Sequence, residues 1–350
     1  YIAGNKNCNG SWLPYFAKID WQGNVIFEKD YCNNPNLGYS QYQSIMLGYN
    51  NGIIKMDLDE EGNIYSPIRP KKPDGNYDLG VCKFNQTGEV VWCSFLNTLD
   101  YAPSYGSDAA DERAFDAEID SAHNAVYMFG RGPGLQNFVV ARFKATTGEK
   151  EWAVWYQNPG NDECWNGTID SQGNPIAAGY VNDGNPNKDW GILKLDPNGN
   201  VLWFKVYDPQ GSWDALRDVM ADQNDNIIAF GNPGAIKYDS AGNLKWARDD
   251  LGINAFRVGI DRNGNSYGFD ESTLYKLDPD GNTVWIFQPG NMTFYSGEVG
   301  KSGLVILANE TDGVYSILSQ GYADKAVLIT KKPINYFKLY SFSADIPSYS

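Results

Sequence analysis

The chain has 350 residues, and its 42% hydrophobic and 20% charged content is typical of a globular protein rather than a disordered one. Its formal net charge of −15 argues strongly against nucleic acid or an anionic membrane surface as a partner, since both would repel it. No apolar run approaches the roughly 18 residues of a membrane-spanning helix, so we expect no membrane span.

Two short phrases alternate along the chain, and each predicts two strands joined by a tight turn. One phrase ends at an aromatic residue, and its copies are KIDWQGNVIF (18–27), KFNQTGEVVW (83–92), RFKATTGEKEW (142–152), DWGILKLDPNGNVLW (189–203), KYDSAGNLKW (237–246) and KLDPDGNTVW (276–285). The other phrase precedes most of these, and its copies are LDEEGNIY (58–65), IDSAHNAVYMFG (119–130), IDSQGNPIAAG (169–179), MADQNDNIIAFG (220–231) and IDRNGNSYGF (260–269). The Asp, Asn and Gly residues at their centres suit turns with positive φ, and the flanking residues alternate or run apolar, as strands do.

Alternating hairpins repeated along one chain predict a β-propeller, because a single blade cannot bury both of its faces and must stack on its neighbours. We therefore predict an all-β fold: a single β-propeller domain over residues 1–350, with seven four-stranded blades. The blades are expected at 1–31, 52–96, 114–156, 166–207, 216–249, 255–288 and 296–331. The first blade lacks its innermost strand. The strand-like residues 335–342 would supply that strand, so that the N- and C-terminal strands pair and close the ring.

The first residues, YIAG (1–4), match the IAAG at 176–179, so the chain begins in the middle of a blade. We expect either that a signal or leader has been removed or that earlier residues are missing. A chain that begins within a blade is also consistent with a place in a larger assembly.

The five cysteines are an odd number, which leaves at least one of them without an intramolecular partner. Cys8 and Cys32 fall in two loops of the first blade that share one face, and they are the candidate disulfide. Cys82 and Cys93 flank one hairpin. A three-residue loop in that hairpin sets Cys82 opposite Trp92 and points the two sulfur atoms to opposite faces of the sheet. We therefore predict no disulfide between Cys82 and Cys93.

The two kinds of loop are expected on opposite faces of the ring. The tight turns within the phrases lie on one face, and the opposite face, here named the long-loop face, has the variable loops at 31–51, 66–77, 97–113, 156–165, 181–188 and 207–215. Loops above a rigid scaffold are common binding sites. The candidate binding residues on this face are Tyr39, Tyr42, Tyr101, Tyr105, Asp162, Trp165, Trp213 and Asp214. Such side chains suit sugar rings or a protein interface, and the alternative is that they pack against their own loops.

The loop NDGNPNKD (182–189) is the candidate metal site. It places oxygen-bearing side chains at alternate positions, namely Asp183, Asn185, Asn187 and Asp189. This spacing resembles the first four ligand positions of a calcium-binding loop. Lys188 and Lys194 stand where such a loop has Gly and Glu, which weakens the match. Calcium is therefore the only cofactor that the sequence suggests.

The only histidine, His123, stands where sister repeats have Gly173 and Gly264, and we expect it to adopt the left-handed conformation of that turn position. A turn histidine argues against Ser-His and Cys-His catalysis and against histidine-rich metal sites. Chemistry by paired carboxylates stays open. The acidic residues expected to point into the central channel are Glu118, Asp218 and Glu298.

Two stretches, WDALRDVMADQNDNIIAFGNPGAIKYD (213–239) and residues 189–203, resemble the seven-bladed propeller repeats of bacterial secreted and surface proteins, known as SBBP-type repeats. FKATTGEKEW (143–152) resembles the related quinoprotein-type repeat. The resemblance extends over about residues 50–290. It implies a propeller scaffold of secreted or surface proteins with no fixed activity, so the function has to be argued from the site.

We accordingly expect a non-enzymatic extracellular or particle-surface propeller that acts as a protein-interaction or structural scaffold through its long-loop face. The alternative is a carbohydrate-binding propeller, and a third reading is a carboxylate-dependent glycan hydrolase or lyase. The expected partner is a protein or a glycan.

Overall fold

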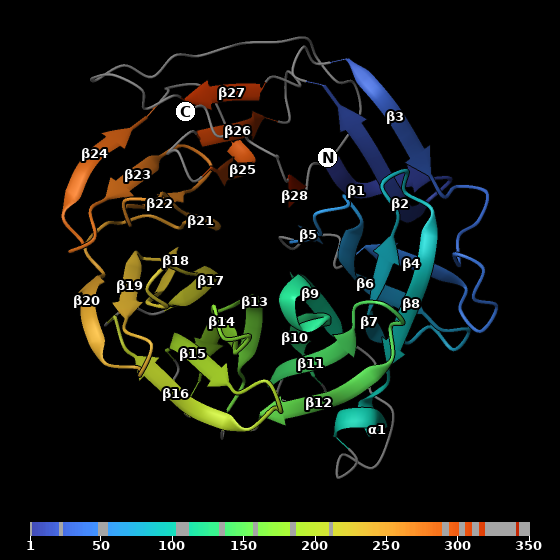
Figure 1. Ribbon diagram of the computed structural model, residues 1–350, viewed down its shortest axis with the longest axis horizontal. Coiled ribbons are helices and arrows are strands. Elements are labelled where there is room, and N and C mark those ends of the chain that lie inside the picture. The colour runs from blue at the N-terminus through green and yellow to red at the C-terminus, as the bar shows by residue number, and fades with distance from the viewer. Residues whose placement is uncertain are drawn as a thin grey trace.

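The structure is a computed structural model of the chain. It describes residues 2–20, 24–47, 55–102, 112–132, 137–156, 160–182, 187–209, 213–288, 294–300, 305–309, 315–318 and 341–342. The described residues form antiparallel sheets arranged like blades around a central axis (Figure 1). The predicted all-β, propeller-like fold with four-stranded blades is therefore confirmed.

The sheets follow the chain in order around the axis. The first contains β1 (Ile2–Cys8), β2 (Ser11–Ile19), β3 (Val25–Asp30) and β28 (Ser341–Phe342). The second contains β4 (Ser44–Leu47), β5 (Asp57–Leu58), β6 (Ile64–Lys71), β7 (Leu79–Phe84) and β8 (Val90–Leu96). The third contains β9 (Arg113–Asp120), β10 (Ala125–Arg131), β11 (Phe138–Lys144) and β12 (Lys150–Tyr156). The fourth contains β13 (Glu163–Ile169), β14 (Pro175–Val181), β15 (Asp189–Leu195) and β16 (Val201–Tyr207).

The remaining sheets complete the series. The fifth contains β17 (Ala215–Ala221), β18 (Ile227–Asn232), β19 (Ala235–Tyr238) and β20 (Leu244–Arg248). The sixth contains β21 (Arg257–Ile260), β22 (Ser266–Phe269), β23 (Leu274–Leu277) and β24 (Thr283–Phe287), and the seventh contains β25 (Phe294–Val299), β26 (Val305–Asn309) and β27 (Tyr315–Leu318). Two short helices, α1 (Thr98–Tyr101) and the 3-10 helix η2 (Ser121–His123), lie between strands. The described part of the chain has no helix long and apolar enough to cross a membrane.

The second blade begins earlier than the sequence indicates. Both β4 and β5 pair with β6, so the innermost position of this blade is shared by two short segments that begin at Ser44 instead of at residue 52. In the first blade, β28 pairs with β1 through Ile2–Phe342 and Ala3–Ser341. This pairing agrees with the expected role of residues 335–342, of which 335–340 lie outside the described residues. Closure of the ring stays a prediction.

The hydrophobic core lies between consecutive blades rather than within them. Phe16 and Ile68 belong to one cluster between the first and second blades, and five further clusters follow between successive blades up to the seventh. Gly167 of β13 faces the ring of Phe129, where an added Cβ would lie 2.3 Å from a ring carbon. The inner strands therefore need a small residue at that point for adjacent blades to approach.

Repeated polar contacts join each blade to the next. The indole nitrogens of Trp92, Trp152, Trp203 and Trp246, all on outermost strands, donate to a carbonyl in the outer turn of the following blade, at 3.0–3.2 Å. In three of these four turns an Asp carboxylate accepts backbone N–H groups, as Asp196 does from Asn198 and Asn200, while the turn that Trp92 contacts has no Asp. The phrase that identifies the repeat in sequence thus encodes both the turn and the contact between blades.

The structure corrects the prediction for Cys82 and Cys93, which form a disulfide. The three-residue loop is present, but Val91 is an extra bulged residue, so Lys83 pairs with Trp92 and Cys82 pairs directly with Cys93. The same one-residue shift occurs in the outer hairpin of every blade from the first to the sixth. The prediction was wrong because it omitted this bulge.

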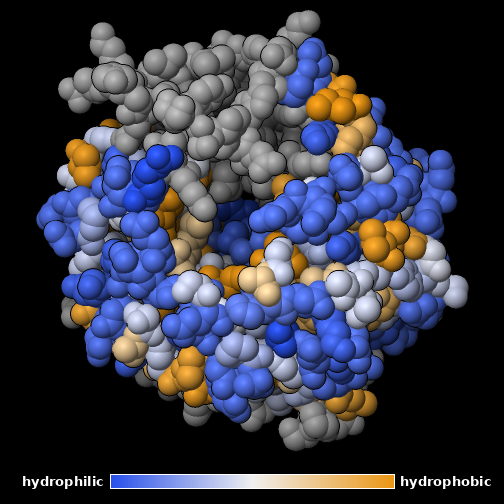
Figure 2. Space-filling model, viewed as in Figure 1, coloured by the Kyte–Doolittle hydropathy of each residue, from blue (hydrophilic) through white to orange (hydrophobic). Residues whose placement is uncertain are grey.

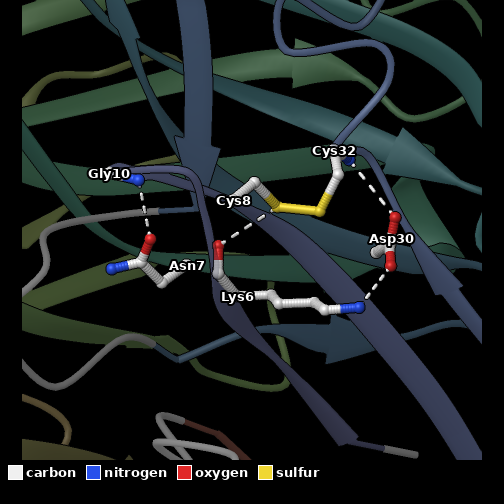
Figure 3. Close-up of a disulfide and its surroundings, with 6 residues drawn as sticks. All are labelled: Lys6, Asn7, Cys8, Gly10, Asp30 and Cys32. Atoms are coloured by element: carbon white, nitrogen blue, oxygen red, sulfur yellow. Dashed lines mark hydrogen bonds and ion pairs between the residues drawn. A yellow bond between two sulfur atoms is a disulfide. The ribbon is translucent and has the colours of Figure 1, made fainter.

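The predicted disulfide between Cys8 and Cys32 is present (Figure 3). It joins the β1–β2 turn to the segment after β3, next to the ion pair of Lys6 with Asp30. The turn around His123 differs from expectation. His123 is in η2 with its Nδ1 2.7 Å from Asp120 Oδ2, and it is Asn124 that has positive φ, at 50°.

Candidate functional site

Three of the predicted binding tyrosines already have hydrogen-bond partners within the protein. Tyr42 donates to Asp78 at 2.8 Å, and Tyr39 accepts from the backbone N–H of Cys93 at 2.8 Å. Tyr101 is buried and donates to Glu112. Tyr101 thus packs within its own loop, as the alternative expects, whereas Tyr39 and Tyr42 fix their loop to residues at the edge of β7 and on β8. Tyr105 lies outside the described residues.

Trp165 and Trp213 are brought together at the long-loop end of the fourth and fifth blades. With Tyr180 they form a group of three rings whose centroids lie 5.7–6.2 Å apart, a spacing typical of aromatic packing. Tyr180 is 2% exposed and forms the base of the group, whereas Trp213 is 45% exposed. The group therefore presents one large aromatic side chain to solvent on a buried aromatic support.

Two cations cover the faces of these rings. Lys188 Nζ lies 3.5 Å from the centroid of Tyr180 and 4.5 Å from that of Trp213, and the guanidinium of Arg217 lies 4.6 Å from the centroid of Trp165. Such distances are typical of cation–π contacts. We name these five residues, Trp165, Tyr180, Lys188, Trp213 and Arg217, the aromatic–cation cluster.

The local fold explains how the cluster forms. Trp165 is the bulged residue of β13 and Arg217 is the bulged residue of β17, each at the same place in its inner hairpin. A bulge turns the extra side chain away from the regular alternation of the strand. Equivalent positions of two neighbouring blades therefore present a Trp and an Arg to each other. The sequence analysis named Trp165 but missed Arg217, although aligning the two phrases reveals the equivalence.

The predicted acids near this cluster are buried. Asp162 accepts from the backbone N–H of Asn182 at 2.8 Å, and Asp214 donates its own backbone N–H to the Lys188 carbonyl at 3.1 Å. A third acid, Glu163, accepts from the Trp165 indole at 2.6 Å and pairs with Arg131. These contacts position the cluster and its loops.

The candidate calcium loop is described only in its second half. Asp183 and Asn185 lie outside the described residues, whereas Asp189 begins β15 and pairs with Val181. Asn187 precedes that strand. Within the described ranges there is no group of three or more His, Cys, Asp or Glu side chains that could hold a metal ion.

A second polar cluster lies in the central channel, where the innermost strands meet. Lys55 Nζ is 2.5 Å from Glu118 Oε1 and 3.9 Å from Asp218 Oδ1, and it donates to the Gly167 carbonyl at 3.4 Å. Glu118 and Asp218 thus lie where the sequence placed them, while the side chain of Glu298 lies outside the described residues. The space-filling view is hollowed at its centre, with hydrophilic residues at the bottom (Figure 2).

The electrostatics of this channel are dominated by burial. Burial raises the pKa of Glu118 to about 7 and raises those of Asp57 and Asp116 above their usual range. Burial lowers the pKa of Lys55, but the carboxylates of Glu118, Asp116 and Asp218 outweigh it, so the net shift is upward. Lys55 was missed in the sequence. It stands four residues before the turn residue Asp59. Asp116 and Asp218 stand at the same distance before the turn residues Asp120 and Asp222.

No family model matches this sequence, and none of the curated proteins does either. Among solved structures, a virginiamycin B lyase from Staphylococcus aureus matches with a TM-score of 0.55 and 11% identity, over 84% of this chain and 89% of that chain. The C-terminal WD40 domain of Sif2 matches with a TM-score of 0.50 and 10% identity, over 91% of this chain and 77% of that domain. Identities this low show the fold alone: the chain has a β-propeller fold. The likeness to SBBP-type repeats stays a resemblance.

Proposed function

We propose that this protein is a non-enzymatic binding propeller that acts as a protein-interaction scaffold through its long-loop face, with the aromatic–cation cluster at the centre of the contact. The observation that supports this most directly is the half-exposed Trp213, which packs on the buried Tyr180 and on Trp165, with Arg217 over the Trp165 ring. Trp, Tyr and Arg are the residues that contribute most binding energy at protein interfaces. The solved structures that share the fold include a lyase and a WD40 domain, so the fold leaves the activity open and the site has to decide it.

The two disulfides support a location outside the reducing cytosol. The Cys8–Cys32 and Cys82–Cys93 bonds both lie in the first two blades, and such bonds persist in oxidising compartments. We propose an extracellular or particle-surface location, in agreement with the resemblance to repeats of secreted and surface proteins.

Glycan binding is the second candidate, and the exposed face of Trp213 is the observation that favours it, because sugar rings stack on such faces. The cluster offers little further stacking surface. Lys188 already covers Tyr180 and one face of Trp213, and Arg217 covers Trp165. Protein binding is therefore the better supported of the two.

The test is affinity capture of partners from the surface extract and medium of the cells that produce the protein, followed by cross-linking and mass spectrometry. Wild type is compared with Trp213→Ala and with Leu244→Ser, a control that changes a half-exposed residue on the outer strand β20. We expect a stoichiometric partner that cross-links to the long-loop face, is lost with Trp213→Ala and is kept with Leu244→Ser. Capture that is indifferent to Trp213, or binding only to a glycan array, would contradict the proposal.

A further inference from the structure

The charge of the aromatic–cation cluster contrasts with that of the whole chain. The protein has a formal net charge of −15, yet Lys188 lies over the exposed Trp213 and Arg217 lies over the adjoining Trp165. No ion pair to a carboxylate joins either of them within the part of the chain that the structure describes. Arg217 instead donates from Nε to the Asn254 side-chain oxygen at 2.7 Å, which leaves the outer nitrogens of its guanidinium for another acceptor.

Both cations are partly removed from water. Burial lowers the pKa of Arg217. Burial also lowers the pKa of Lys188, with Glu163 opposing and Arg131 adding to the effect. A half-buried cation has lost part of its hydration, and without a carboxylate partner little offsets that cost. An anion that binds beside it would offset the cost through electrostatic attraction.

The carboxylate of Glu163, which acts on the charge of Lys188, is already engaged. Glu163 accepts from the Trp165 indole through Oε2 and pairs with Arg131 through Oε1. Its position at the base of the cluster fixes Trp165 for the approach of Arg217. The chain thus supplies a packed aromatic group, a carboxylate bonded to Trp165 and Arg131, and two cations over the rings.

We propose that the aromatic–cation cluster is a receptor for a carboxylate-bearing segment of a protein partner, with an Asp or Glu side chain bound between Lys188 and Arg217 and an apolar neighbour packed on Trp213. Guanidinium and ammonium groups bind carboxylates through charge-assisted hydrogen bonds. The ring faces are covered by cations, which favours an acidic peptide over a neutral sugar. This inference rests on the proposed function and specifies the chemistry of the partner at the same site.

The direct test uses oligoglutamate as the probe and oligoglutamine of equal length as the neutral comparison, with binding measured by isothermal titration calorimetry at low and high salt. The variants are Arg217→Gln and Lys188→Gln. Lys245→Gln is the matched control, since it removes the same charge from an exposed position on β20. Melting temperatures of all variants are measured first, and Arg217→Lys tests whether a charge alone is sufficient.

We expect oligoglutamate to bind, with an affinity that falls as salt rises, and to lose about tenfold or more in affinity in each cluster variant. Arg217→Lys should keep part of the affinity and Lys245→Gln all of it. No binding of oligoglutamate, equal binding of oligoglutamine, or equal loss with Lys245→Gln would overturn the inference.

Two further outcomes separate this inference from the proposed function. If oligogalacturonate binds at the cluster and oligoglutamate does not, the receptor takes acidic glycans and the peptide proposal fails. If capture of a partner depends on Trp213 but not on the charges of Lys188 and Arg217, the scaffold function stands and the carboxylate receptor falls.

Discussion

Replacing Lys55 with methionine tests whether the central channel depends on this one cation. Lys55 Nζ is 2.5 Å from Glu118 Oε1 and 3.9 Å from Asp218 Oδ1, and its backbone N–H donates to the Phe115 carbonyl at 3.1 Å. The side chain thus joins β9 of the third blade to β17 of the fifth. Lys55→Met leaves the backbone contact in place and removes the ammonium group, with its charge among the buried carboxylates and its hydrogen bond to the Gly167 carbonyl.

The expected cost at neutral pH is about 3 kcal/mol of unfolding free energy. Breaking a buried ion pair by removing one partner typically costs about 3–5 kcal/mol. The lower end applies because the Lys55 side chain is still 21% exposed. The cost should depend on pH, since the remaining acids can be neutralised by protonation.

The sign of that pH dependence follows from Glu118. Its folded pKa of about 7 lies above its ordinary value of 4.5, so the folded state holds this proton more tightly than the unfolded state does. Its contribution to stability is full below about pH 4.5 and is lost as the pH rises through about 7, and it amounts to roughly 3 kcal/mol at most. Lys55→Met lacks the cation that lowers the pKa of Glu118, so Glu118 is protonated and uncharged in the folded variant near about pH 5. The stability lost by the variant should therefore be smallest there.

The assay is urea unfolding followed by tryptophan fluorescence at about pH 5 and about pH 8, on wild type and Lys55→Met. Lys6→Met is the control, because the Lys6–Asp30 pair has the same 2.5 Å separation but its side chains are 41% and 31% exposed. The control should change stability by about 1 kcal/mol or less. The double variant Lys55→Met/Glu118→Gln should recover part of the loss at the higher pH. An unchanged stability of Lys55→Met at about pH 8, or a loss of equal size at both pH values, would refute this account of the channel.

Three further predictions concern the fold. Replacing both Cys82 and Cys93 by Ser should lower the unfolding free energy by about 2–3 kcal/mol, because the disulfide closes a loop in the unfolded chain. Peptide mapping without reductant shows whether the bond is present, and thermal unfolding measures its effect. A wild-type melting temperature that reductant does not change would contradict this prediction. Trp152→Phe keeps an aromatic ring at this position but removes the indole hydrogen bond to the Pro197 carbonyl of the next blade, so we expect a loss of about 1 kcal/mol or more in urea unfolding. An unchanged midpoint would show that the bond adds nothing. Gly167→Ala should lower the unfolding free energy by about 1–3 kcal/mol, because the added methyl group meets the ring of Phe129. Adding Phe129→Leu to the same chain should reduce that loss. Losses that simply add in the double variant would argue against the contact.

The repeat phrases predicted the architecture because they encode local geometry. The D-x-x-G-N turns form through a carboxylate that accepts nearby backbone N–H groups, and that interaction needs no distant residue. Trp92, Trp152, Trp203 and Trp246 recur at the ends of the phrases because each makes the same contact with the following blade. Strand order and the inner and outer hairpins could therefore be read from the sequence.

The errors arose where the register depended on one extra residue. The bulge at Val91 moved Cys93 opposite Cys82, and the bulges at Trp165 and Arg217 aimed those two side chains at each other. The residue type gives no signal for a bulge here, since bulged positions hold side chains as different as Val91, Lys245 and Arg217. The effect of a bulge is nevertheless large, because a shift of one residue reverses the face on which a side chain lies.

By itself the sequence determined the class of fold, the hairpins and the face on which the long loops lie, because each of these depends on contacts within one repeat. Only the tertiary structure decided which loop residues meet. Tyr101 is bonded within its loop and Tyr42 to Asp78 of the same blade, while Trp165 and Trp213 join Lys188 and Arg217 across two blades. These partners are brought together by the packing of neighbouring blades, and distances between blades depend on the whole assembled ring rather than on any one phrase.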